Sequence, residues 1–385
     1  MYTVIKIILI IIISSSIAYS LQEGSFCKTK NDENGVCKRY SDCPLILNKL
    51  RNREIGRSDV IDCNAYGVIC CPVEIARIKG EISNRKCKEI ESLTQTKIRV
   101  GVSILNPNGT LLTASRCKHK SVSLIVGGEE AYRYEFPHQA LLGYMTGKGI
   151  QWACGGSLIS SKYVLTGMKF LIYFSECNKL TSFLAAHCNY RRSLREIKFV
   201  KLGMLDRSQD DSDVFIYNVI NKIIHPQYDR ISFNNDIALL ELDKDVKFSE
   251  YIYPICLPTR QHDEEKAIVT GLGTTGKGHA QSEKLLKVVL EKFSNRECQE
   301  NVPQPIDKAS MVCYGDNSDS KDACRGDSGG PIQVPNDDES HCTYKIIGVV
   351  SFGALNCGTP GIPSIFVNVY NYLSWIEDII WKDEK

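Results

Sequence analysis

The sequence predicts an all-β protein with a C-terminal helix, preceded by a small disulfide-rich module. Short β-branched runs separated by turns, such as "VLT", "KIIGVVSFG" and "SIFVNV", are typical of strands. Near the end, "YNYLSWIEDIIWK" places Leu373, Ile376, Ile379 and Ile380 at helical spacing. Near the start, residues 27–71 contain six cysteines and few large apolar side chains, so disulfides must replace a core there.

Residues 1–20 have the pattern of a secretion signal. One lysine precedes a run of Ile and Leu, and small residues follow up to Ser20. The alternative is a membrane anchor, but the apolar run is short for a span of roughly 20 residues. We therefore expect a secreted, extracellular chain that is not held in a membrane. The 17 cysteines suit that compartment, and the net charge of +2 favours neither nucleic acid nor an anionic membrane surface as a partner.

Residues 72–124 are charged and mixed in composition, with little strand alternation, and we interpret them as a linker or pro-region. They include "NPNGT", a turn signal that contains an N-glycosylation acceptor at Asn108. The run "SLIVGGEEA" follows. It is either an ordinary strand end and turn or, given what comes after it, a new amino terminus made by cleavage between Leu124 and Ile125.

Three later motifs offer the parts of a serine nucleophile. "RGDSGGP" places Ser328 in a glycine-rich turn, "NNDIALLEL" places Asp236 before an apolar strand, and "AAHC" contains His187. A serine needs a base, a carboxylate that orients the base, and backbone N–H groups aimed at the oxyanion. We expect His187, Asp236 and Ser328 in these three roles, with Gly326 and Ser328 giving the N–H groups.

Together these motifs resemble the clip-domain serine protease zymogens of arthropods, which belong to the chymotrypsin-like family. The adjacent cysteines of "CCP" are the most specific part of the likeness at the amino terminus. The resemblance implies a clip domain at 27–71 and a chymotrypsin-like double β-barrel at 125–382, with the triad between the barrels. It also implies that the freed amino group of Ile125 pairs with buried Asp327, because a buried charge is tolerated only when paired.

The sequence alone leaves the cysteine pairing open, and a zinc site is the alternative in the first module. The module lacks histidine, which disfavours zinc. The resemblance implies the following pairs: Cys27–Cys70, Cys37–Cys63, Cys43–Cys71, Cys154–Cys188, Cys298–Cys313, Cys324–Cys357 and, as a tether from the pro-region to the protease domain, Cys117–Cys256. Elimination then leaves Cys87–Cys342, with Cys177 as the odd cysteine.

Asp322 stands six residues before Ser328, where an acid in this family selects Arg or Lys. Ser351 and Gly353 of "SFG" would line the same pocket. Ser364 takes the place of a second pocket glycine of trypsin-like members. Its side chain would either narrow the base of the pocket or hydrogen-bond to Asp322, which leaves the choice between Arg and Lys open.

Eighteen residues, 167–184, separate "YVLT" from "AAHC". Without them the chain would run "SKYVLTAAHCNY", the whole histidine motif, and Cys177 would be gone. The insertion is apolar and poor in turn residues, so as an exposed loop it would favour aggregation. We hypothesise that these residues are the translation of a retained intron. The codons for Gly-Met can contain a GT splice donor, and those for Phe-Leu-Ala can contain a pyrimidine-rich run that ends in an AG acceptor. The alternative is a genuine surface insertion whose ends lie close together.

The resemblance implies a secreted zymogen in an extracellular cascade of the Toll, melanisation or patterning type. Its partners would be an upstream protease that cuts after leucine, a downstream protease zymogen cut after Arg or Lys, and serpin inhibitors. The alternative is an inactive homologue that acts as a binding cofactor. We expect no cofactor, although the acidic loop 206–213 offers carboxylate oxygens to calcium; the alternative there is a solvated run of charges.

Overall fold

The structure is a computed structural model of the 385-residue chain. It describes residues 23–32, 34–63, 67–72, 79–100, 110–115, 128–167, 196–208, 213–274, 280–302, 305–318, 322–324, 326–336, 343–353 and 358–384. The chain divides into two compact units, Met1–Ile78 and Lys79–Lys385.

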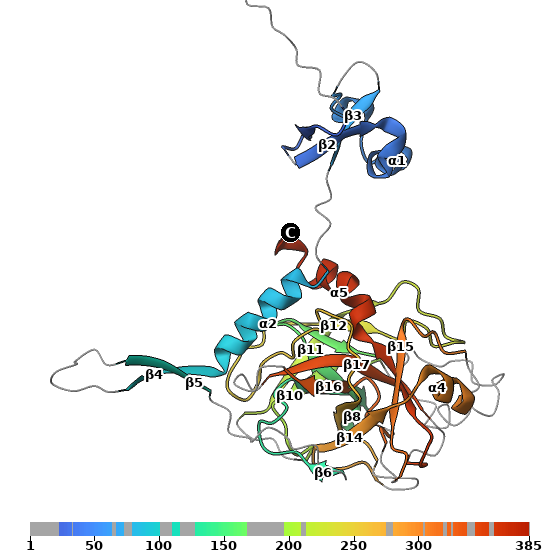
Figure 1. The fold of residues 1–385 in the computed structure, drawn as a ribbon. Coiled ribbons are helices and arrows are strands. Elements are labelled where there is room, and N and C mark those ends of the chain that lie inside the picture. Colours follow the sequence, from blue (N-terminus) through green and yellow to red (C-terminus); the bar gives the residue numbers. More distant parts are fainter. Residues whose placement is uncertain are drawn as a thin grey trace, which may run out of the picture. The chain divides into compact units, whose positions relative to one another are not determined.

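The first unit contains a three-stranded antiparallel sheet and one α-helix (Figure 1). Its elements are β1 (Phe26–Lys28), β2 (Asn34–Arg39), α1 (Pro44–Arg51) and β3 (Val68–Pro72). Three disulfides join Cys27 to Cys70, Cys37 to Cys63 and Cys43 to Cys71, the pairs that the resemblance implies. The apolar core is small, so cross-links carry much of the stability of this unit.

A helix and a strand pair open the second unit, in a segment where the sequence predicted only a linker. They are α2 (Glu81–Leu93), β4 (Gln95–Val100) and β5 (Thr110–Ser115). The buried residues of α2 are Ile82, Ser83, Cys87 and Ile90, which form one stripe along the helix. This stripe is why the segment folds as a helix against the protease barrels.

The first barrel is closed and has six strands, in the order β7, β8, β9, β12, β11, β10 and back to β7. Their bounds are β7 (Gln139–Thr146), β8 (Gly149–Leu158), β9 (Tyr163–Thr166), β10 (Phe199–Leu202), β11 (Phe215–Ile224) and β12 (Ala238–Leu242). Alternate residues of these strands, among them Leu142, Leu158, Val164, Val200 and Leu240, fill the interior.

The second barrel closes through the pairing of β13 with β14. Its ring runs β13 (Lys266–Gly271), β16 (Pro331–Pro335), β17 (Tyr344–Phe352), β18 (Ser364–Asn368), β15 (Met311–Gly315) and β14 (Leu286–Lys292). The short β6 (Glu129–Glu130) adds to β14, and α4 (Asn295–Asn301) follows β14. β6 thereby fixes the chain just after the expected cleavage point to this barrel.

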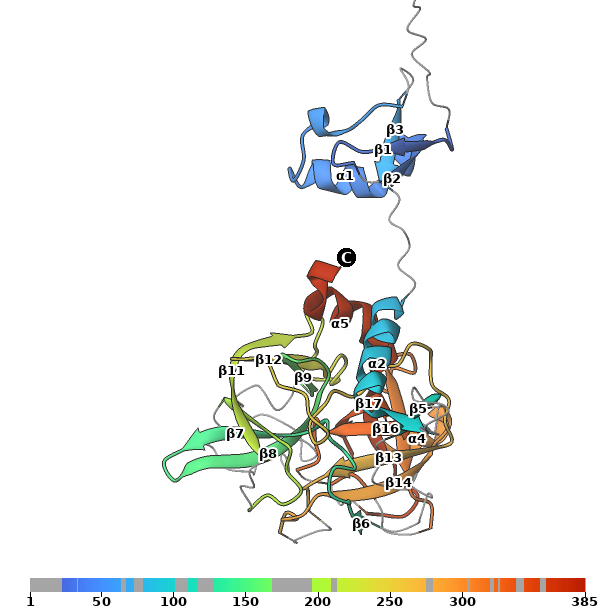
Figure 2. The same cartoon turned by 90° about the vertical axis from the view of Figure 1, so that its left-hand side faces the viewer.

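The chain ends in α5 (Leu373–Ile380), which follows the 3-10 turn η5 (Val369–Tyr372). Leu373 and Ile376 are fully buried, and Ile379 and Ile380 pack partly against the same core. α2 lies beside α5 in both views of the fold (Figure 1 and Figure 2). The predicted all-β class, the double barrel and the C-terminal helix are confirmed.

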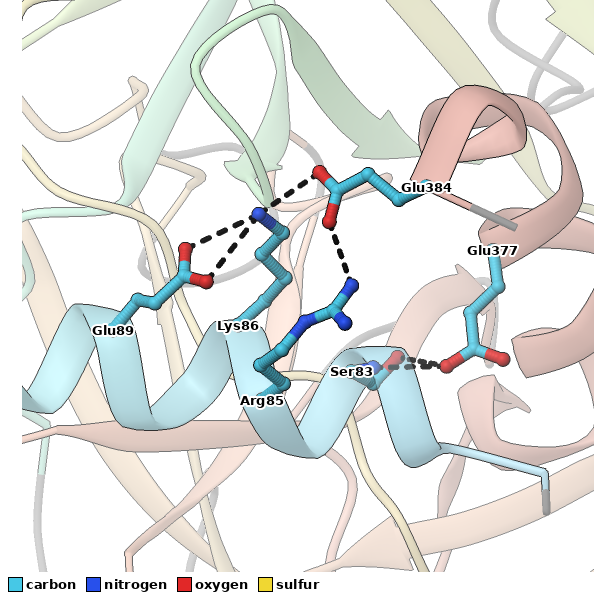
Figure 3. A network of polar contacts seen from close by, with 6 residues as sticks. All are labelled: Ser83, Arg85, Lys86, Glu89, Glu377 and Glu384. Carbon is cyan, nitrogen blue, oxygen red and sulfur yellow. Dashed lines mark hydrogen bonds and ion pairs between the residues drawn. The ribbon is translucent and has the colours of Figure 1, made fainter.

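Polar contacts fasten α2 to the C-terminal segment (Figure 3). Glu377 of α5 is 2% exposed, and it accepts hydrogen bonds from the backbone N–H of Ser83 at 2.9 Å and from the Ser83 hydroxyl at 2.7 Å. Arg85 and Lys86 both pair with Glu384 at the surface. A carboxylate at the amino end of a helix is also favoured by the helix dipole.

In the described part of the chain, no helix has both the length and the apolar composition that a membrane crossing requires.

Candidate active site

Ser328 lies in a tight turn directly before β16. Within the turn, the N–H of Asp327 donates to the carbonyl of Cys324 at 3.0 Å, and the N–H of Gly330 donates to the carbonyl of Asp327 at 2.8 Å. The carbonyl of Ser328 accepts from the N–H of Gly155, on β8 of the other barrel, at 2.9 Å. The nucleophile candidate is therefore held at the junction of the two barrels.

Two glycines beside Ser328 have positive φ angles, 107° at Gly326 and 80° at Gly329. Residues with a Cβ rarely adopt such angles. A Cβ on Gly329 would also collide with the side chain of Thr166, and one on Gly326 would lie 2.9 Å from the Cα of Gly273. These positions require glycine, which explains the "GDSGGP" pattern, and they place the N–H groups of Gly326 and Ser328 on one turn.

Asp236 is fully buried two residues before β12. One carboxylate oxygen, Oδ2, accepts a hydrogen bond of 2.5 Å from the hydroxyl of Ser351 on β17. The preceding residue, Asn235, has a φ of 58°, and its side chain donates to the carbonyl of Gln227 and accepts from the hydroxyl of Tyr372. Ser351, which the sequence assigns to the pocket wall, thus fixes the orientation of Asp236.

Strand β9, which precedes the histidine motif in the sequence, ends close to Asp236. Thr166, the last residue of β9, pairs with Ala238 of β12, two residues after Asp236. Its hydroxyl donates to the carbonyl of Gly155 at 2.9 Å, and the N–H of Gly155 reaches Ser328. His187 lies outside the described residues. The fold therefore brings together Asp236, Ser328 and the end of β9.

Asp327 points into a pocket made by backbone. Its carboxylate accepts from the N–H of Gly273 at 2.7 Å and from the N–H of Cys324 at 2.9 Å. A Cβ on Gly271 or Gly273 would collide with this carboxylate, so both glycines make room for it. Burial raises the pKa of Asp327 to about 6, while the two N–H donors and the charge of Arg207 act to lower it.

Asp322 and Ser364 are in direct contact at the base of the expected specificity pocket. The hydroxyl of Ser364 donates to Asp322 Oδ1 at 2.6 Å, and the N–H of Gly358 donates to Oδ2 at 3.2 Å. A Cβ on Gly353 would collide with the hydroxyl of Ser364. Burial raises the pKa of Asp322 to about 6, and the hydrogen bond from Ser364 lowers it. The sequence left open whether Ser364 narrows the base of the pocket or hydrogen-bonds to Asp322, and the structure shows the hydrogen bond.

The tether from the pro-region to the protease barrels differs from the expected one. Cys256 is bonded to Cys87 of α2, with the two Cα atoms 5.0 Å apart, so the predictions Cys117–Cys256 and Cys87–Cys342 are wrong. The reason is that Cys87 lies on the buried stripe of α2, which faces the segment around Cys256. Cys117 and Cys342 lie outside the described residues.

The other expected disulfides are described in part. Cys298 and Cys313 are bonded, as the resemblance implies. Cys324 is disulfide-bonded and Cys154 is buried in the first barrel, but their expected partners, Cys357 and Cys188, lie outside the described residues.

Several further predicted residues fall outside the described part of the chain, namely Leu124, Ile125, Asn108, Cys177 and most of the insertion 167–184. Part of the acidic loop 206–213 is described. Asp206 accepts two hydrogen bonds from Ser208, and Asp213 pairs with Arg133 at 3.3 Å and accepts from the hydroxyl of Tyr134. Calcium binding at this loop stays a prediction.

Sequence reasoning missed Arg207, which lies in the loop after β10. Its guanidinium donates to the side chain of Gln281 and to the carbonyl of Leu272, both at 2.6 Å. The only sequence signal is an arginine within an acidic run, and that signal does not identify these acceptors.

Comparison with known proteins places the chain in a family. The family model for trypsin matches residues 125–168 and 180–376. Serine protease snk of Drosophila melanogaster is 30% identical over 386 positions, which cover 96% of this chain and 82% of the relative. Melanization protease 1 of the same species is 29% identical over 96% of each chain, and CLIP domain-containing serine protease B15 of Anopheles gambiae is 29% identical over 96% of this chain and 95% of the relative. The chain therefore belongs to the trypsin family of serine proteases, among its clip-domain members.

Proposed function

We propose that this chain is the zymogen of a secreted serine endopeptidase that cleaves after Arg or Lys in an extracellular protease cascade. The observation that carries the proposal is the meeting of Asp236, Ser328 and the end of β9 between two barrels. Ser328 attacks the peptide carbonyl, His187 accepts and returns the proton, and Asp236 orients His187. The N–H groups of Gly326 and Ser328 stabilise the oxyanion.

The position of His187 depends on residues 167–184. Without them His187 follows Thr166 by three residues, and three extended residues span about 10 Å at most. In the register of β9 with β12, the residues after Thr166 run alongside those before Ala238, which include Asp236. In the joined chain, His187 would therefore lie within reach of the buried carboxylate.

The trypsin family match supports the joined chain. It breaks between residues 168 and 180, inside the insertion, and resumes before the histidine motif. We propose that the functional protein joins Thr166 to Ala185 and that residues 167–184 are a retained intron. Sequencing cDNA across codons 160–190 tests this. Transcripts lacking the 18 codons are expected, whereas an insert in every transcript, with no exon junction in the gene, contradicts it.

Activation uses the buried carboxylate of Asp327. Cleavage between Leu124 and Ile125 creates an α-ammonium group, and a positive charge beside Asp327 would offset the burial that now raises its pKa. The described chain resumes at Gly128, so only two residues separate the new terminus from a segment that is already fixed through β6. The upstream protease must accept leucine before the cut bond.

Asp322 gives the preference for a basic side chain. A desolvated guanidinium or ammonium group forms a strong charge-assisted hydrogen bond with a carboxylate. Ser364 already occupies one lone pair of Asp322, so it reduces the room for a bidentate guanidinium. The natural substrate is proposed to be a downstream protease zymogen, and serpins are the proposed inhibitors, by analogy with the cascade proteases that this chain resembles.

The deciding experiment compares full-length zymogens with and without residues 167–184. Residues 120–124 are replaced by four aspartates and a lysine, so that enteropeptidase cuts before Ile125, and the new terminus is verified by sequencing. Chromogenic peptides ending in Arg, Lys or Leu are then offered, with Ser328→Ala as the control. Hydrolysis after Arg or Lys by the joined chain, lost in Ser328→Ala, supports the proposal.

A second function has one observation in its favour. The full 385-residue chain has 18 residues between the end of β9 and the histidine motif. A product that keeps them would have a displaced His187, and we propose that it would act as an inactive, binding homologue. No hydrolysis by either chain after verified cleavage would favour this function over the protease.

A further inference from the structure

Arg207 links the first barrel to the loop beside the nucleophile candidate. It lies in the loop after β10, and its N–H donates to the carbonyl of Glu283 at 2.6 Å. A second backbone bond, from the N–H of Leu285 to the carbonyl of Leu205, runs 2.8 Å. The loops 205–207 and 283–285, one from each barrel, are therefore joined by backbone before any side chain is considered.

The guanidinium of Arg207 uses two nitrogens on two different acceptors. Nη1 donates to Oε1 of Gln281 at 2.6 Å, and Nη2 donates to the carbonyl of Leu272 at 2.6 Å. Both hydrogen bonds are short, as expected when the donor carries a charge. A planar fork suits two acceptors at once, whereas a lysine ammonium on the same stem is a single point charge.

Both acceptors belong to segments that contact the turn containing Ser328. A Cβ on Gly326 would collide with the side-chain amide of Gln281, so Gln281 covers Gly326 closely. Leu272 precedes Gly273, whose N–H donates to the carboxylate of Asp327 at 2.7 Å. One side chain thus supports the neighbours of the oxyanion donor and of the carboxylate that receives the new terminus.

The charge of Arg207 acts on the same pocket. It lowers the pKa of Asp327, against the larger raising effect of burial. Lys201 also approaches the loop, where its ammonium donates to the carbonyl of Arg207 at 3.2 Å. Positive charge beside a buried carboxylate favours its ionised form, which is the form that pairs with an ammonium group.

We propose that Arg207 is a positioning residue for catalysis, which holds Gln281 and the segment 272–273 against Gly326 and Asp327. This inference rests on the proposed function. Arg207 reaches the turn of Ser328 through Gln281 and through residues 272–273, so we expect its effect on the rate of the chemical step, through the placement of the oxyanion donors. Loss of one such donor costs on the order of a hundredfold or more in kcat, and a displaced donor costs less.

The test uses the enteropeptidase-cleaved, joined chain with three variants: Arg207→Met, Arg207→Lys and Gln281→Leu. For Arg207→Met we expect kcat to fall about ten- to a hundredfold per titrated active site while KM changes less than threefold. Arg207→Lys should recover only part of the rate. The double variant Arg207→Met/Gln281→Leu should be no worse than Arg207→Met by more than about twofold, because the two residues act as one unit. The control is Arg133→Met, which removes a guanidinium at an exposed position, where its partner is Asp213; its kcat should stay within twofold.

A second measurement does not need catalysis. Amide hydrogen exchange of the cleaved protein should be faster at Gly273 and residues 326–328 in Arg207→Met than in Arg133→Met, since the supported N–H groups lose protection. Normal kcat with unchanged exchange in Arg207→Met would overturn the inference. The inference would also be overturned if Arg207→Met lowered only the number of active sites and left kcat per site unchanged, because that result indicates misfolding of part of the protein. If the unsubstituted chain itself shows no hydrolysis, the proposed protease function fails, and the exchange comparison still decides the positioning role.

Discussion

Asp236 and Ser351 show how single residues set the geometry of the candidate site. A buried carboxylate needs a partner for each oxygen, and Ser351 donates to one of them from the opposite barrel. This contact holds the carboxylate in one orientation, and we propose that in this orientation it also accepts from the N–H of His187. Ser351 thus makes the proposed role of Asp236 depend on the correct docking of the two barrels.

Substituting Ser351→Ala should lower kcat/KM of the cleaved, joined chain about ten- to a hundredfold. A hydrogen bond to a charged group is worth roughly 1.5–3 kcal/mol, and each 1.36 kcal/mol corresponds to about a tenfold change in rate. Ser157→Ala is the matched control, because Ser157 is also fully buried but its hydroxyl has no hydrogen-bond partner among the described residues. Equal rates for the two variants would contradict the role of Ser351.

The pKa of Asp322 predicts how a cationic ligand binds to the proposed specificity pocket. Burial raises this pKa to about 6, so the carboxyl is ionised at pH 7–8 and becomes neutral as the pH falls through 6. The dissociation constant of benzamidine, measured by calorimetry, should be constant above pH 7 and should rise about tenfold per pH unit well below 6.

The pKa of Asp327 is also raised to about 6, so the pH profile alone does not identify the titrating group. The variant Ser364→Gly distinguishes the two carboxyl groups, because Ser364 contacts Asp322. Removing the Ser364 hydroxyl removes a hydrogen bond that lowers the pKa of Asp322, so the loss of benzamidine affinity should begin at a higher pH. An onset that does not move would show that another group controls binding.

At the scale of elements, α2 belongs to the protease unit. Ser83 in its first turn gives two hydrogen bonds to buried Glu377 (Figure 3). Cys87 of the same helix forms a disulfide with Cys256. Removing the hydroxyl in Ser83→Ala leaves Glu377 with fewer donors in a buried place. The free energy of unfolding should fall by about 1–3 kcal/mol.

Arg85→Ala is the control for this prediction. Arg85 pairs with Glu384 through side chains that are 55% and 37% exposed, and such surface pairs contribute roughly 0–1 kcal/mol. Urea unfolding of the two variants should therefore give a clearly lower midpoint for Ser83→Ala alone. Identical midpoints would mean that α2 is not held through Glu377.

The elements that sequence predicted are those whose own residues favour them. The strands of both barrels consist largely of β-branched and apolar residues, and α5 has an apolar stripe of its own. α2 could not be predicted in the same way, because its buried stripe contains only two isoleucines, a serine and a cysteine. Its stability comes from α5 and from the disulfide, which are 169 or more residues away in sequence.

At the scale of the whole molecule, the Cys87–Cys256 bond joins the two chains that cleavage would produce. Mass spectrometry of a non-reduced digest should find one linked peptide pair containing Cys87 and Cys256. A pair containing Cys117 and Cys256 would contradict the structure. After cleavage at Ile125, the fragment with α2 should stay with the barrels until a reductant is added.

The candidate site was predictable to the extent that motifs carry it. Ser328, Asp236 and Asp327 lie in short runs whose glycines and apolar neighbours have local reasons, and the structure places these residues together. Arg207 was not predictable, because its two acceptors are 65 and 74 residues away along the chain. The tether was wrongly assigned for a related reason, since only the helical stripe of α2 selects Cys87.

The central claim is that the joined chain, in which Thr166 meets Ala185, is a protease that depends on Ser328. The most direct measurement is the hydrolysis rate of an Arg-terminated peptide after verified cleavage before Ile125. We predict that the joined chain hydrolyses it at least about a thousandfold faster than its Ser328→Ala variant. The chain that keeps residues 167–184 should be far slower than the joined chain. A joined chain no faster than Ser328→Ala would contradict the account.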